Sequence, residues 1–533
     1  MQSKPPRPSP ADTTTLYASL SATARARPDK TALIEDEAET TYARLLRRVD
    51  RLAAFLRAHG VGPGDRVAVM LLNSVDFCAA FYAVQKLGAA CVMINTKWQA
   101  PEIRHALETT GATTMILNAR WLDKLRDVLP FVPLRQLLLD AVPEGLDAGL
   151  PVFPLSAADA ETFPPDNGDE ANPETIGVVM FTSGTTGKPK GAMLSHRNMM
   201  HSILSYAELL NPDSDETAVL PIPAFHITGL ICVLGLFIHI GGTTVLRPVF
   251  DPLDTLKAME RHRATHFHAV PTVFIALTKA LETFPGDVTP LRTALCGGGF
   301  ITDAAIRALK KRLPNLEFRP VYGLTETSGA GVGFPCDYLA LDKKTSAGIA
   351  LPVAEVFTAD ASGNRLPIGE TGEICMRGPS VVRGYYGMDD LPGGVLRTGD
   401  VGTIDADGFI YILDRIKDAI NRGGEKIFSL EVENALMEMP AVRQAAVFAL
   451  PDPYYGETVA AAIVARDGFP VTADRVRDFL STRLAKFKIP ESLFFLDALP
   501  VNASNKVLKS RLREQFGTPV TLKDAEASHF VTQ

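Results

Sequence analysis

The sequence lacks several features that would each assign it to a familiar class of protein. It has six cysteines in 533 residues, and no two of them have the C-x-x-C spacing of a metal or redox site. Most of them lie among apolar neighbours, so we expect buried thiols in a reducing compartment. A basic surplus is also missing, because the net charge is -7 and the pI is near 5.9. This acidic balance argues against a nucleic-acid-binding protein.

Long apolar stretches are absent as well. The most apolar run, residues 227–240, contains Gly229 and Gly235 and is too short to span a bilayer. Residues 1–15 hold four prolines and no apolar core, so we expect a disordered tail rather than a signal peptide. These features predict a soluble, cytoplasmic protein without a transmembrane segment.

The chain is long and rich in apolar residues, and strand patterns alternate along it with helix patterns. With 46% hydrophobic residues the chain can bury sizeable cores, and its length suggests about two to four domains. Residues 41–59 and 76–88 have the character of helices, and residues 66–72 and 89–95 that of strands. This alternation predicts parallel sheets with helices on their faces.

The pattern changes near residues 414–417. Beyond this point we expect helices at 429–437 and 476–487 and strands at 441–450 and 493–499, with Ser429 as a helix N-cap. The segment therefore predicts a compact α+β unit.

Residues 181–191, Phe-Thr-Ser-Gly-Thr-Thr-Gly-Lys-Pro-Lys-Gly, follow an apolar strand end. Glycines let a backbone present its N–H groups to an anion, and the hydroxyls and lysines add donors and positive charge. Pro189 after Lys188 excludes a Walker A loop, which needs Ser or Thr there. The pattern predicts a loop that holds the polyphosphate of a nucleotide, with a flexible surface turn as the alternative.

Further motifs follow this loop in order. They are Pro-Ile-Pro-Ala-Phe-His at 221–226, Tyr-Gly-Leu-Thr-Glu-Thr at 322–327, Arg-Thr-Gly-Asp at 397–400, Asp-Arg-Ile-Lys-Asp at 414–418, Gly-Gly-Glu at 423–425 and Pro-Val-Asn-Ala-Ser-Asn-Lys at 500–506. The ordered set resembles the adenylate-forming superfamily of acyl-CoA synthetases, peptide-synthetase adenylation domains and beetle luciferases, and within it the AMP-dependent CoA ligase branch. The resemblance covers residues 16 to 513.

The resemblance implies an α/β fold with two domains. A large N-terminal domain would hold packed, mostly parallel sheets with helices and a β-subdomain, and a small mobile α+β domain would follow. We therefore expect a tail at 1–15, an ATP- and acyl-binding domain at 16–414, a hinge at 415–418 that contains Lys417, a lid domain at 419–515 and a tail at 516–533.

The resemblance also implies a nucleotide site. The residues that would hold the β- and γ-phosphates are Thr182, Ser183, Gly184, Thr185, Thr186, Gly187 and Lys188. The sequence leaves two roles open for Lys190, which are phosphate contact and a solvated surface charge. Thr325 would contact the α-phosphate and Glu326 would bind Mg²⁺, which favours oxygen ligands.

The rest of the nucleotide site is implied in the same way. Tyr322 would stack on adenine, and Gly297, Gly298 and Gly299 would lie against adenine and the acyl carbonyl. Gly323 would belong to the cofactor site and border the acyl pocket. Asp400 would accept hydrogen bonds from the ribose hydroxyls, and Arg415 would donate to the ribose or phosphate.

Lys506 is the expected catalytic residue of adenylation. Its ammonium can bridge the substrate carboxylate and the α-phosphate, which cancels their repulsion in the transition state. Asn505 stands where the family usually has Gly, and Asn tolerates a positive φ better than most residues. Lys509 is the competing candidate.

On the acyl side, the resemblance implies that His226 is a second catalytic residue, which would lie beside the substrate carboxylate and gate its access to the acyl pocket or the CoA tunnel. The alternative is a core histidine with satisfied hydrogen bonds. Gly229, His268, Ser328 and Gly329 would line the pocket, and the small residues at 328–333 indicate a roomy one. His266 and His268 would share one face of a strand at 264–270, where a pocket wall or core is favoured over a metal site.

The same resemblance implies a second half-reaction. Gly423, Gly424 and Glu425 would line a tunnel for the pantetheine arm of CoA. Phe225 is followed by His226 rather than Asp, which disfavours an amino acid substrate. Luciferase-like oxygenation shares the motifs but needs a special substrate.

We therefore expect an acyl-CoA synthetase that uses ATP, Mg²⁺ and CoA to activate a hydrophobic carboxylic acid. The alternatives are an acyl-AMP ligase that loads a carrier protein and an inactive nucleotide-binding homologue. The sequence leaves the oligomeric state open, a homodimer included.

Overall fold

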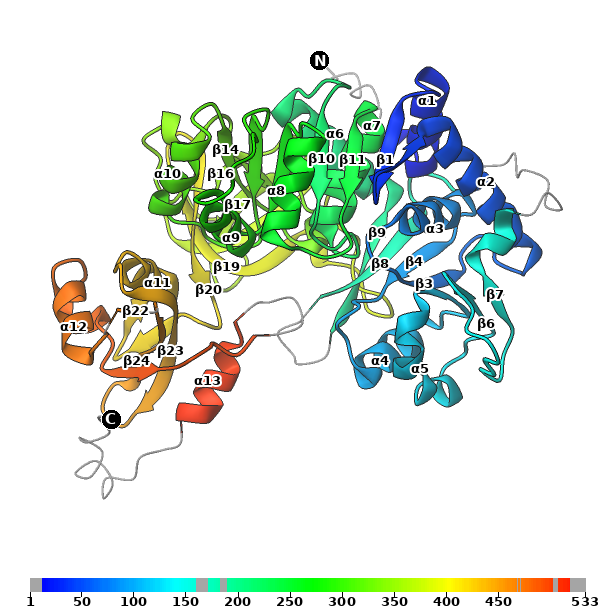
Figure 1. Cartoon of the computed structure of the whole chain (residues 1–533). Helices are drawn as coiled ribbons and strands as arrows, with labels where there is room; N and C mark the ends of the chain where they lie inside the picture. The colour runs from blue at the N-terminus through cyan, green and yellow to red at the C-terminus, as the bar shows by residue number, and fades with distance from the viewer. Residues whose placement is uncertain are drawn as a thin grey trace, which may run out of the picture. The chain divides into compact units, whose positions relative to one another are not determined.

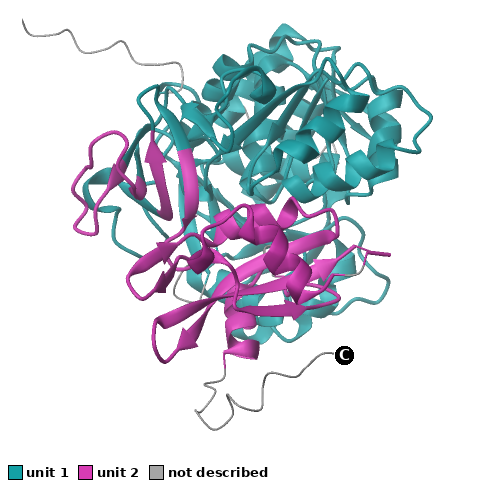
Figure 2. Ribbon diagram, turned by 90° about the vertical axis from the view of Figure 1, so that its left-hand side faces the viewer, with its two compact units in different colours: residues 1–357, 375–398, 405–410 teal, residues 358–374, 399–404, 411–533 magenta. Residues whose placement is uncertain are grey.

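The computed structural model describes residues 12–159, 171–182, 189–466, 468–469, 471–501 and 507–517. The chain divides into two compact units, which Figure 2 shows in different colours. Unit 1 comprises residues 1–357, 375–398 and 405–410, and unit 2 comprises residues 358–374, 399–404 and 411–533.

One sheet of unit 1 is built from the β-α-β pattern that the sequence predicts. Its strands, in order across the sheet, are β7 (Val152–Pro154), β6 (Gln136–Leu139), β5 (Thr114–Leu117), β3 (Arg66–Met70), β4 (Ala90–Met93), β8 (Ile176–Thr182) and β9 (Lys190–Ser195). Neighbours run parallel as far as β8, and β9 returns antiparallel to it. The helix α3 (Val75–Lys86) connects β3 to β4 and packs on both. Strands β4, β5 and β6 are buried at every residue, as the continuous apolar runs of parallel strands require.

A second sheet of unit 1 positions most of the predicted site. Its strands in this unit are, in order, β16 (Gly348–Ala350), β15 (Val332–Gly333), β14 (Glu317–Tyr322), β13 (Thr293–Cys296), β12 (His266–Ala269), β10 (Thr217–Leu220), β11 (Thr243–Leu246), β1 (Thr31–Glu35) and β2 (Ala38–Thr41). From β14 to β1 the neighbours are parallel, so their carboxyl ends meet at one edge. The crossover helices α8 (Pro252–Arg261), α9 (Pro271–Leu281) and α10 (Asp303–Arg312) lie side by side (Figure 1).

Four further strands contribute residues to both units. They are β17 (Glu355–Ala359), β18 (Gly372–Arg377), β19 (Leu396–Ile404) and β20 (Phe409–Arg415).

The apolar run at residues 227–240 forms a buried element, as predicted. It consists of a π-helix, η5 (Thr228–Gly235), followed by α7 (Leu236–Ile240). Both pack against α6 (His196–Leu210). Among the helices of the described residues, none combines the length and the apolar character that crossing a membrane requires.

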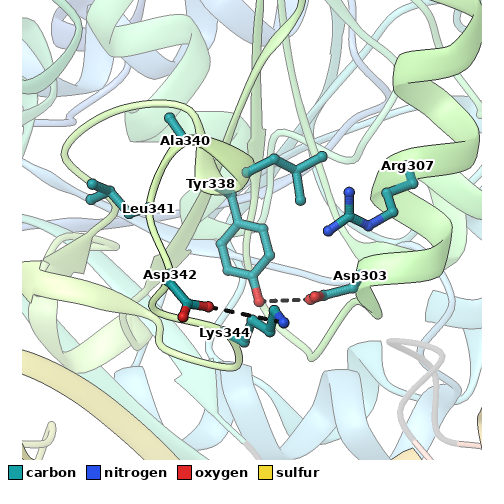
Figure 3. Close-up of a pocket in the computed structure, with 8 residues that line it drawn as sticks. Asp303, Arg307, Tyr338, Ala340, Leu341, Asp342 and Lys344 are labelled. Carbon is teal, nitrogen blue, oxygen red and sulfur yellow. Dashed lines mark hydrogen bonds and ion pairs between the residues drawn. The ribbon is translucent and has the colours of Figure 1, made fainter.

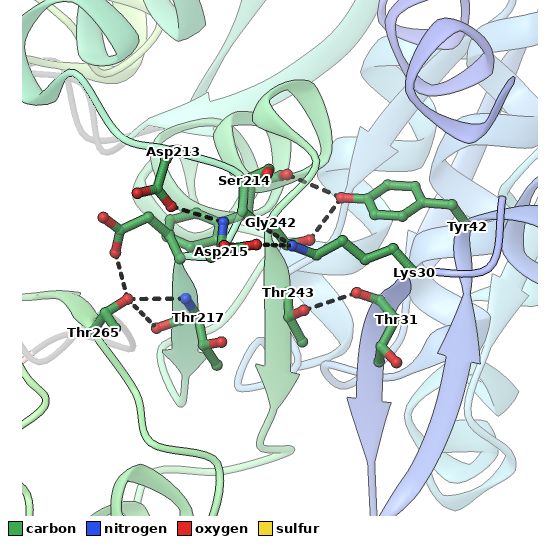
Figure 4. A network of polar contacts seen from close by, with 12 residues as sticks. Lys30, Thr31, Tyr42, Asp213, Ser214, Asp215, Thr217, Gly242, Thr243 and Thr265 are labelled. Atoms are coloured by element: carbon green, nitrogen blue, oxygen red, sulfur yellow. Dashed lines mark hydrogen bonds and ion pairs between the residues drawn. The ribbon is translucent and has the colours of Figure 1, made fainter. Parts of the chain in front are cut away.

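A polar network ties the N-terminal segment to the second sheet (Figure 4). Tyr42 begins α2 (Tyr42–Ala58), is fully buried and donates its hydroxyl to the carbonyl oxygens of Gly242 at 2.7 Å and Phe237 at 3.0 Å. Thr243 donates its hydroxyl to the carbonyl of Thr31 at 2.8 Å. Because a buried hydroxyl is costly without a partner, these bonds fix α2 and β1 against β11.

Residues 12–15, which the sequence places in a tail, are held by specific contacts. Asp12 accepts hydrogen bonds from Arg197 at 2.8 Å and from His201 at 3.0 Å. Thr15 caps α1 (Leu16–Ala26) by accepting from the amide of Ala18. The tail therefore does not extend as far as Thr15.

The carboxyl-terminal part of unit 2 is α+β, as predicted. Its strands are β22 (Glu425–Ile427), β21 (Ile420–Arg422), β24 (Gly456–Ala465) and β23 (Val442–Asp452) in that order, with β25 (Ser492–Phe495) parallel to β24. Its helices are α11 (Ser429–Met437), α12 (Ala473–Ser481) and α13 (Lys509–Phe516).

Two local predictions in this unit are wrong. Ser429 is the first residue of α11 rather than its N-cap, and it donates its hydroxyl to Asp414 at 2.9 Å. The helix expected at 476–487 is α12, which is capped by Thr472 and is followed by a separate 3₁₀ turn at Lys486–Lys488.

Candidate active site

The predicted site loops follow the carboxyl ends of parallel strands in the second sheet. Strand β10 leads into residues 221–226, β13 into residues 297–299 and β14 into residues 323–326. Tyr322 ends β14, and both it and Thr325 are partly exposed. In an open parallel sheet, ligands bind in the crevice outside these strand ends. The topology thus gathers motifs that are far apart in the sequence.

The predicted phosphate loop connects β8 to β9, where Thr182 and Lys190 are paired in register. Residues 183–188, which are Ser183, Gly184, Thr185, Thr186, Gly187 and Lys188, lie outside the described residues. Strand β9 is flanked by residues 384–386. The amide of Met193 donates to the carbonyl of Gly384 at 3.1 Å, and the amide of Tyr386 donates to Gly191 at 2.7 Å.

Glu326 is a buried carboxylate at this edge of the second sheet. It lies in a 3₁₀ turn, η6 (Thr325–Thr327), directly after β14, and is 8% exposed. Its Oε1 accepts hydrogen bonds from the hydroxyls of Thr182 and Tyr385, each at 3.0 Å. Because Thr182 ends β8, this carboxylate joins the two sheets of unit 1 at the start of the predicted phosphate loop.

The oxygen atoms around Glu326 fit a magnesium ion. Mg²⁺ is usually held by one or two carboxylates together with substrate phosphates. Two hydroxyls orient Oε1, and Oε2 accepts no hydrogen bond from the described residues. Nowhere in the described ranges do three or more His, Cys, Asp or Glu side chains form a metal-binding group. Bound beside Glu326, the ion would neutralise negative charge on the phosphates.

Tyr385 is a residue of this site that sequence reasoning missed. Burial and the neighbouring Glu326 carboxylate raise the pKa of its hydroxyl, which therefore remains a donor at neutral pH. Nζ of Lys190 lies 5.4 Å from the centroid of its ring, which gives this lysine a partner. The only sequence signal is a pair of tyrosines between two glycines, and such a pair specifies no hydrogen-bond partner.

The turn at Gly297, Gly298 and Gly299 follows β13, as the sequence predicts. A Cβ on Gly297 would lie 2.9 Å from Val321 and 3.8 Å from Nε2 of His268. The glycine turn and this predicted pocket residue are therefore neighbours.

His226 and Gly229 come from the turn that follows β10. The ring of His226 packs on that of Phe225, with centroids 4.7 Å apart, and its carbonyl accepts from the amide of Leu230 at 2.9 Å. The backbone at Gly229 passes so close to Pro223 that a Cβ would lie 2.7 Å from the proline carbonyl oxygen. The turn thus folds tightly at the start of η5.

The small residues at 328–333 pack closely against neighbouring atoms and do not border open space. A Cβ on Gly329 would lie 2.6 Å from Sγ of Cys232, and its φ is +84°. Ser328 is buried and donates its hydroxyl to the carbonyl of Ser380 at 3.1 Å. The interpretation of these residues as a sign of a roomy pocket is therefore wrong.

His266 and His268 share one face of β12, as the strand period predicts. The ring of His266 lies 5.2 Å from Phe237 of α7, and that of His268 lies 6.0 Å from Tyr206 of α6. Both are buried, and burial lowers the pKa of each to about 3, so both are neutral at physiological pH. They belong to no metal-binding group of the described residues, which favours the wall or core role.

In unit 2, Asp400 and Arg415 form an ion pair. Nε of Arg415 lies 2.6 Å from Oδ1 of Asp400, whose side chain is buried, while the arginine is 40% exposed. The amide of Ile416 donates to the carbonyl of Gly399 at 2.8 Å, which holds the two segments together. The charge-assisted bond fixes the orientation of the carboxylate.

The segment expected to line a pantetheine tunnel is the turn of a hairpin in unit 2. Gly423 and Gly424 connect β21 to β22 with φ values of 60° and 97°. The amide of Gly423 donates to the carbonyl of Tyr455 at 2.8 Å, and Glu425 is exposed. Two positive φ values in a two-residue hairpin turn require residues such as glycine, and the tunnel role stays a prediction.

The two candidate catalytic lysines differ in their surroundings. Lys506 lies outside the described residues, so its role stays a prediction. Nζ of Lys509 lies 2.7 Å from the carboxylate of Glu433 and donates to the hydroxyl of Ser429 at 2.6 Å. These largely buried contacts engage the ammonium of Lys509, which disfavours it as the catalytic lysine.

The predicted hinge residue Lys417 is contacted by α13. Arg513 donates to the carbonyl of Lys417 at 3.3 Å and to the carboxylate of Asp418 at 2.6 Å. The hinge segment is therefore bonded to a helix of unit 2.

A cavity of about 290 Å³ lies elsewhere in unit 1 (Figure 3). Its lining includes Asp303 and Arg307 of α10, Tyr338 of a 3₁₀ turn (Tyr338–Ala340) and Lys344, and Tyr338 donates to Asp303 at 2.8 Å. None of the predicted site residues that the structure describes lines this cavity, so we assign it no role.

Comparisons with known proteins agree with this arrangement. Two family models match the chain: AMP-binding enzyme at residues 20–386 and AMP-binding enzyme C-terminal domain at residues 431–506. The chain is 38% identical to a feruloyl-CoA synthase of an Amycolatopsis species, over 93% of this chain and 97% of that protein. It is 33% identical to the long-chain-fatty-acid–CoA ligase FadD13 of Mycobacterium tuberculosis, over 90% of this chain and 94% of that protein.

A solved structure supports the same assignment. The o-succinylbenzoate CoA synthetase of Bacillus subtilis, in complex with an acyl-adenylate intermediate, is 30% identical with a TM-score of 0.82. The match covers 94% of this chain and 98% of that chain. The chain therefore belongs to the family of AMP-binding enzymes, in its branch of ATP-dependent acyl-CoA synthetases.

Proposed function

We propose that this acyl-CoA synthetase activates an aromatic or similarly bulky hydrophobic carboxylic acid. The observation that carries the proposal is the 38% identity to a feruloyl-CoA synthase over 93% of the chain. The o-succinylbenzoate CoA synthetase is also named for an aromatic acid. The long-chain-fatty-acid relative is less similar, at 33% identity, so fatty acids are the alternative substrate class.

The enzyme catalyses two reactions in sequence. A carboxylate oxygen of the acid first attacks the α-phosphorus of ATP, which yields an acyl adenylate and pyrophosphate. The thiol of CoA then attacks the acyl carbonyl, which yields the thioester and AMP. Both steps depend on neutralising charge and on holding the reactants in line.

We propose for the site residues the roles that the motifs imply. Thr182 and the loop that it begins hold the β- and γ-phosphates, and Glu326 binds the magnesium ion. Asp400, fixed by Arg415, accepts from the ribose hydroxyls. Lys506 bridges the two anions in the first step.

We also propose that the enzyme works in the cytoplasm. All six cysteines are free, and all but Cys336 are buried. Free buried thiols suit a reducing compartment, as does the use of ATP and CoA.

Acid-dependent release of pyrophosphate tests the proposal. The panel contains hydroxycinnamic, other aryl, polycyclic and fatty acids, each measured with and without CoA. We expect the largest kcat/KM with an aryl acid, release stimulated by CoA, and loss of activity in Lys506→Ala. The exposed Lys486 supplies a matched control, because Lys486→Ala removes the same charge from the same unit. A higher kcat/KM for fatty acids would overturn the substrate class, and release that ignores CoA would indicate a carrier-protein acceptor.

A further inference from the structure

Two hydroxyl donors converge on one oxygen of the Glu326 carboxylate. The hydroxyls of Tyr385 and Thr182 each lie 3.0 Å from Oε1. The terminal torsion of a glutamate is broad, so an unbonded carboxylate has no fixed plane. Two donors on one oxygen define that plane and so direct Oε2.

The backbone around Tyr385 is fixed on two sides. On one side, the amide of Val382 donates to the carbonyl of Glu326 at 2.8 Å. On the other, Tyr385 forms a bridge with Ala192 of β9, the strand that follows the predicted phosphate loop. This short segment is therefore bonded both to the predicted metal carboxylate and to the strand that leaves the loop.

The neighbouring tyrosine has a different partner. The hydroxyl of Tyr386 donates to the carbonyl of Thr110, at the end of α4 (Ala100–Thr110), at 3.3 Å. Two adjacent residues of the same type thus have hydroxyls in distinct environments, and only that of Tyr385 reaches Glu326.

We propose that Tyr385 is a positioning residue of the adenylation site, which holds the Glu326 carboxylate in the orientation that binds Mg²⁺ with ATP. The proposal rests on the proposed function, because it assigns the metal to Glu326. It adds that the metal carboxylate is held by one phenol hydroxyl from a segment that is bonded to β9.

The test is equilibrium binding of ATP over a magnesium titration, without acid or CoA, for wild type, Tyr385→Phe and Tyr386→Phe. A hydrogen bond to a charged group is strong enough that its loss should raise the Mg²⁺ concentration for half-maximal ATP binding by about tenfold in Tyr385→Phe. Tyr386→Phe should stay within about twofold of wild type, because it removes a neutral bond away from the carboxylate. ATP binding in excess EDTA should be the same in all three proteins.

Two results would overturn the assignment. One is an unchanged magnesium requirement in Tyr385→Phe, and the other is an equal shift in both variants, which would indicate general loosening of the segment. Failure of the proposed function would appear separately, as a wild-type protein whose ATP binding does not respond to Mg²⁺.

Discussion

At the scale of the residue, burial decides how the histidines of β12 respond to acid. His266 and His268 are enclosed by helices α6 and α7, and their pKa values lie well below that of a free imidazole. The folded protein keeps both neutral, whereas the unfolded chain binds protons below about pH 6.5. Proton binding by the unfolded chain therefore lowers the free energy of unfolding as the pH falls from 6.5 toward 3. Above pH 6.5 the two histidines do not lower it.

His266→Leu tests this linkage without altering the predicted site residues. At pH 5 a buried neutral histidine lowers the free energy of unfolding by about 2 kcal/mol relative to neutral pH. The variant should therefore lose about 2 kcal/mol less than wild type between pH 7 and pH 5. Urea unfolding at both pH values measures the difference, and equal losses in the two proteins would assign the acid sensitivity to other groups.

Single residues were predictable where a motif defined them and not where a distant partner did. Glu326 could be selected as a candidate metal ligand because a carboxylate beside a hydroxyl follows a strand, and this role stays a prediction. Tyr385 could not, because its partner is 59 positions away in the sequence. Ser429 has the composition of a cap, yet its hydroxyl donates to Asp414 across 15 positions. Local propensity cannot anticipate such long-range acceptors.

At the scale of the element, a largely buried ionic network joins α13 to α11 and β20. The Lys509 and Glu433 side chains are 13% and 14% exposed and lie 2.7 Å apart. Burial raises the pKa of Glu433, and the lysine partly opposes this. Asp414 accepts from Ser429, which in turn accepts from Lys509.

Lys509→Met should be strongly destabilising because it leaves the buried carboxylate of Glu433 without its partner. Breaking such a pair costs about 3–5 kcal/mol, whereas the exposed Arg511→Met should stay within about 0.5 kcal/mol of wild type. Adding Glu433→Gln to Lys509→Met should restore much of the loss, because the amide oxygen still accepts from Val447. Denaturant unfolding gives all three values, and a mild effect of Lys509→Met would mean that water reaches the pair.

The helices and strands themselves were predictable to the extent that their periods were clear. A strong amphipathic repeat located α2, and buried apolar runs located β3 and β4. The helix α3 is buried along most of its length, and its place between β3 and β4 located it. The end of α12 was not predictable, because the apolar residues after Ser481 pack against the same core from a separate turn.

At the scale of the whole molecule, the carboxyl-terminal segment contains its own cores. One apolar cluster has all its fully buried members between Ile420 and Leu480, and a second between Ala446 and Leu512. A segment with a complete core is expected to fold without the rest of the chain.

A fragment of residues 411–533 should therefore fold alone. It retains both clusters and the Lys509 network, including Asp414. We expect a single cooperative urea transition by circular dichroism, at the same midpoint when it is followed by tyrosine fluorescence. A gradual, probe-dependent transition would show that residues 358–374 and 399–404, which belong to the same unit, are required.

The order of the domains could be predicted from the sequence, but the interleaving of the two units could not. The β-α-β rhythm and the later α+β pattern are local signals. The assignment of residues 358–374 and 399–404 to unit 2 depends on strand pairing between distant segments, which leaves no local trace.

The close packing around Gly329 restricts substitution at one of the residues predicted to line the acyl pocket. Any side chain there would need a left-handed conformation and would displace Sγ of Cys232, 2.6 Å from the Cβ position. A substitution at Gly329 is therefore strained. At Gly299 the nearest atom, on Pro271, is 3.4 Å away, so a methyl group fits. Of these two predicted site glycines, Gly299 therefore accepts a small side chain more readily than Gly329.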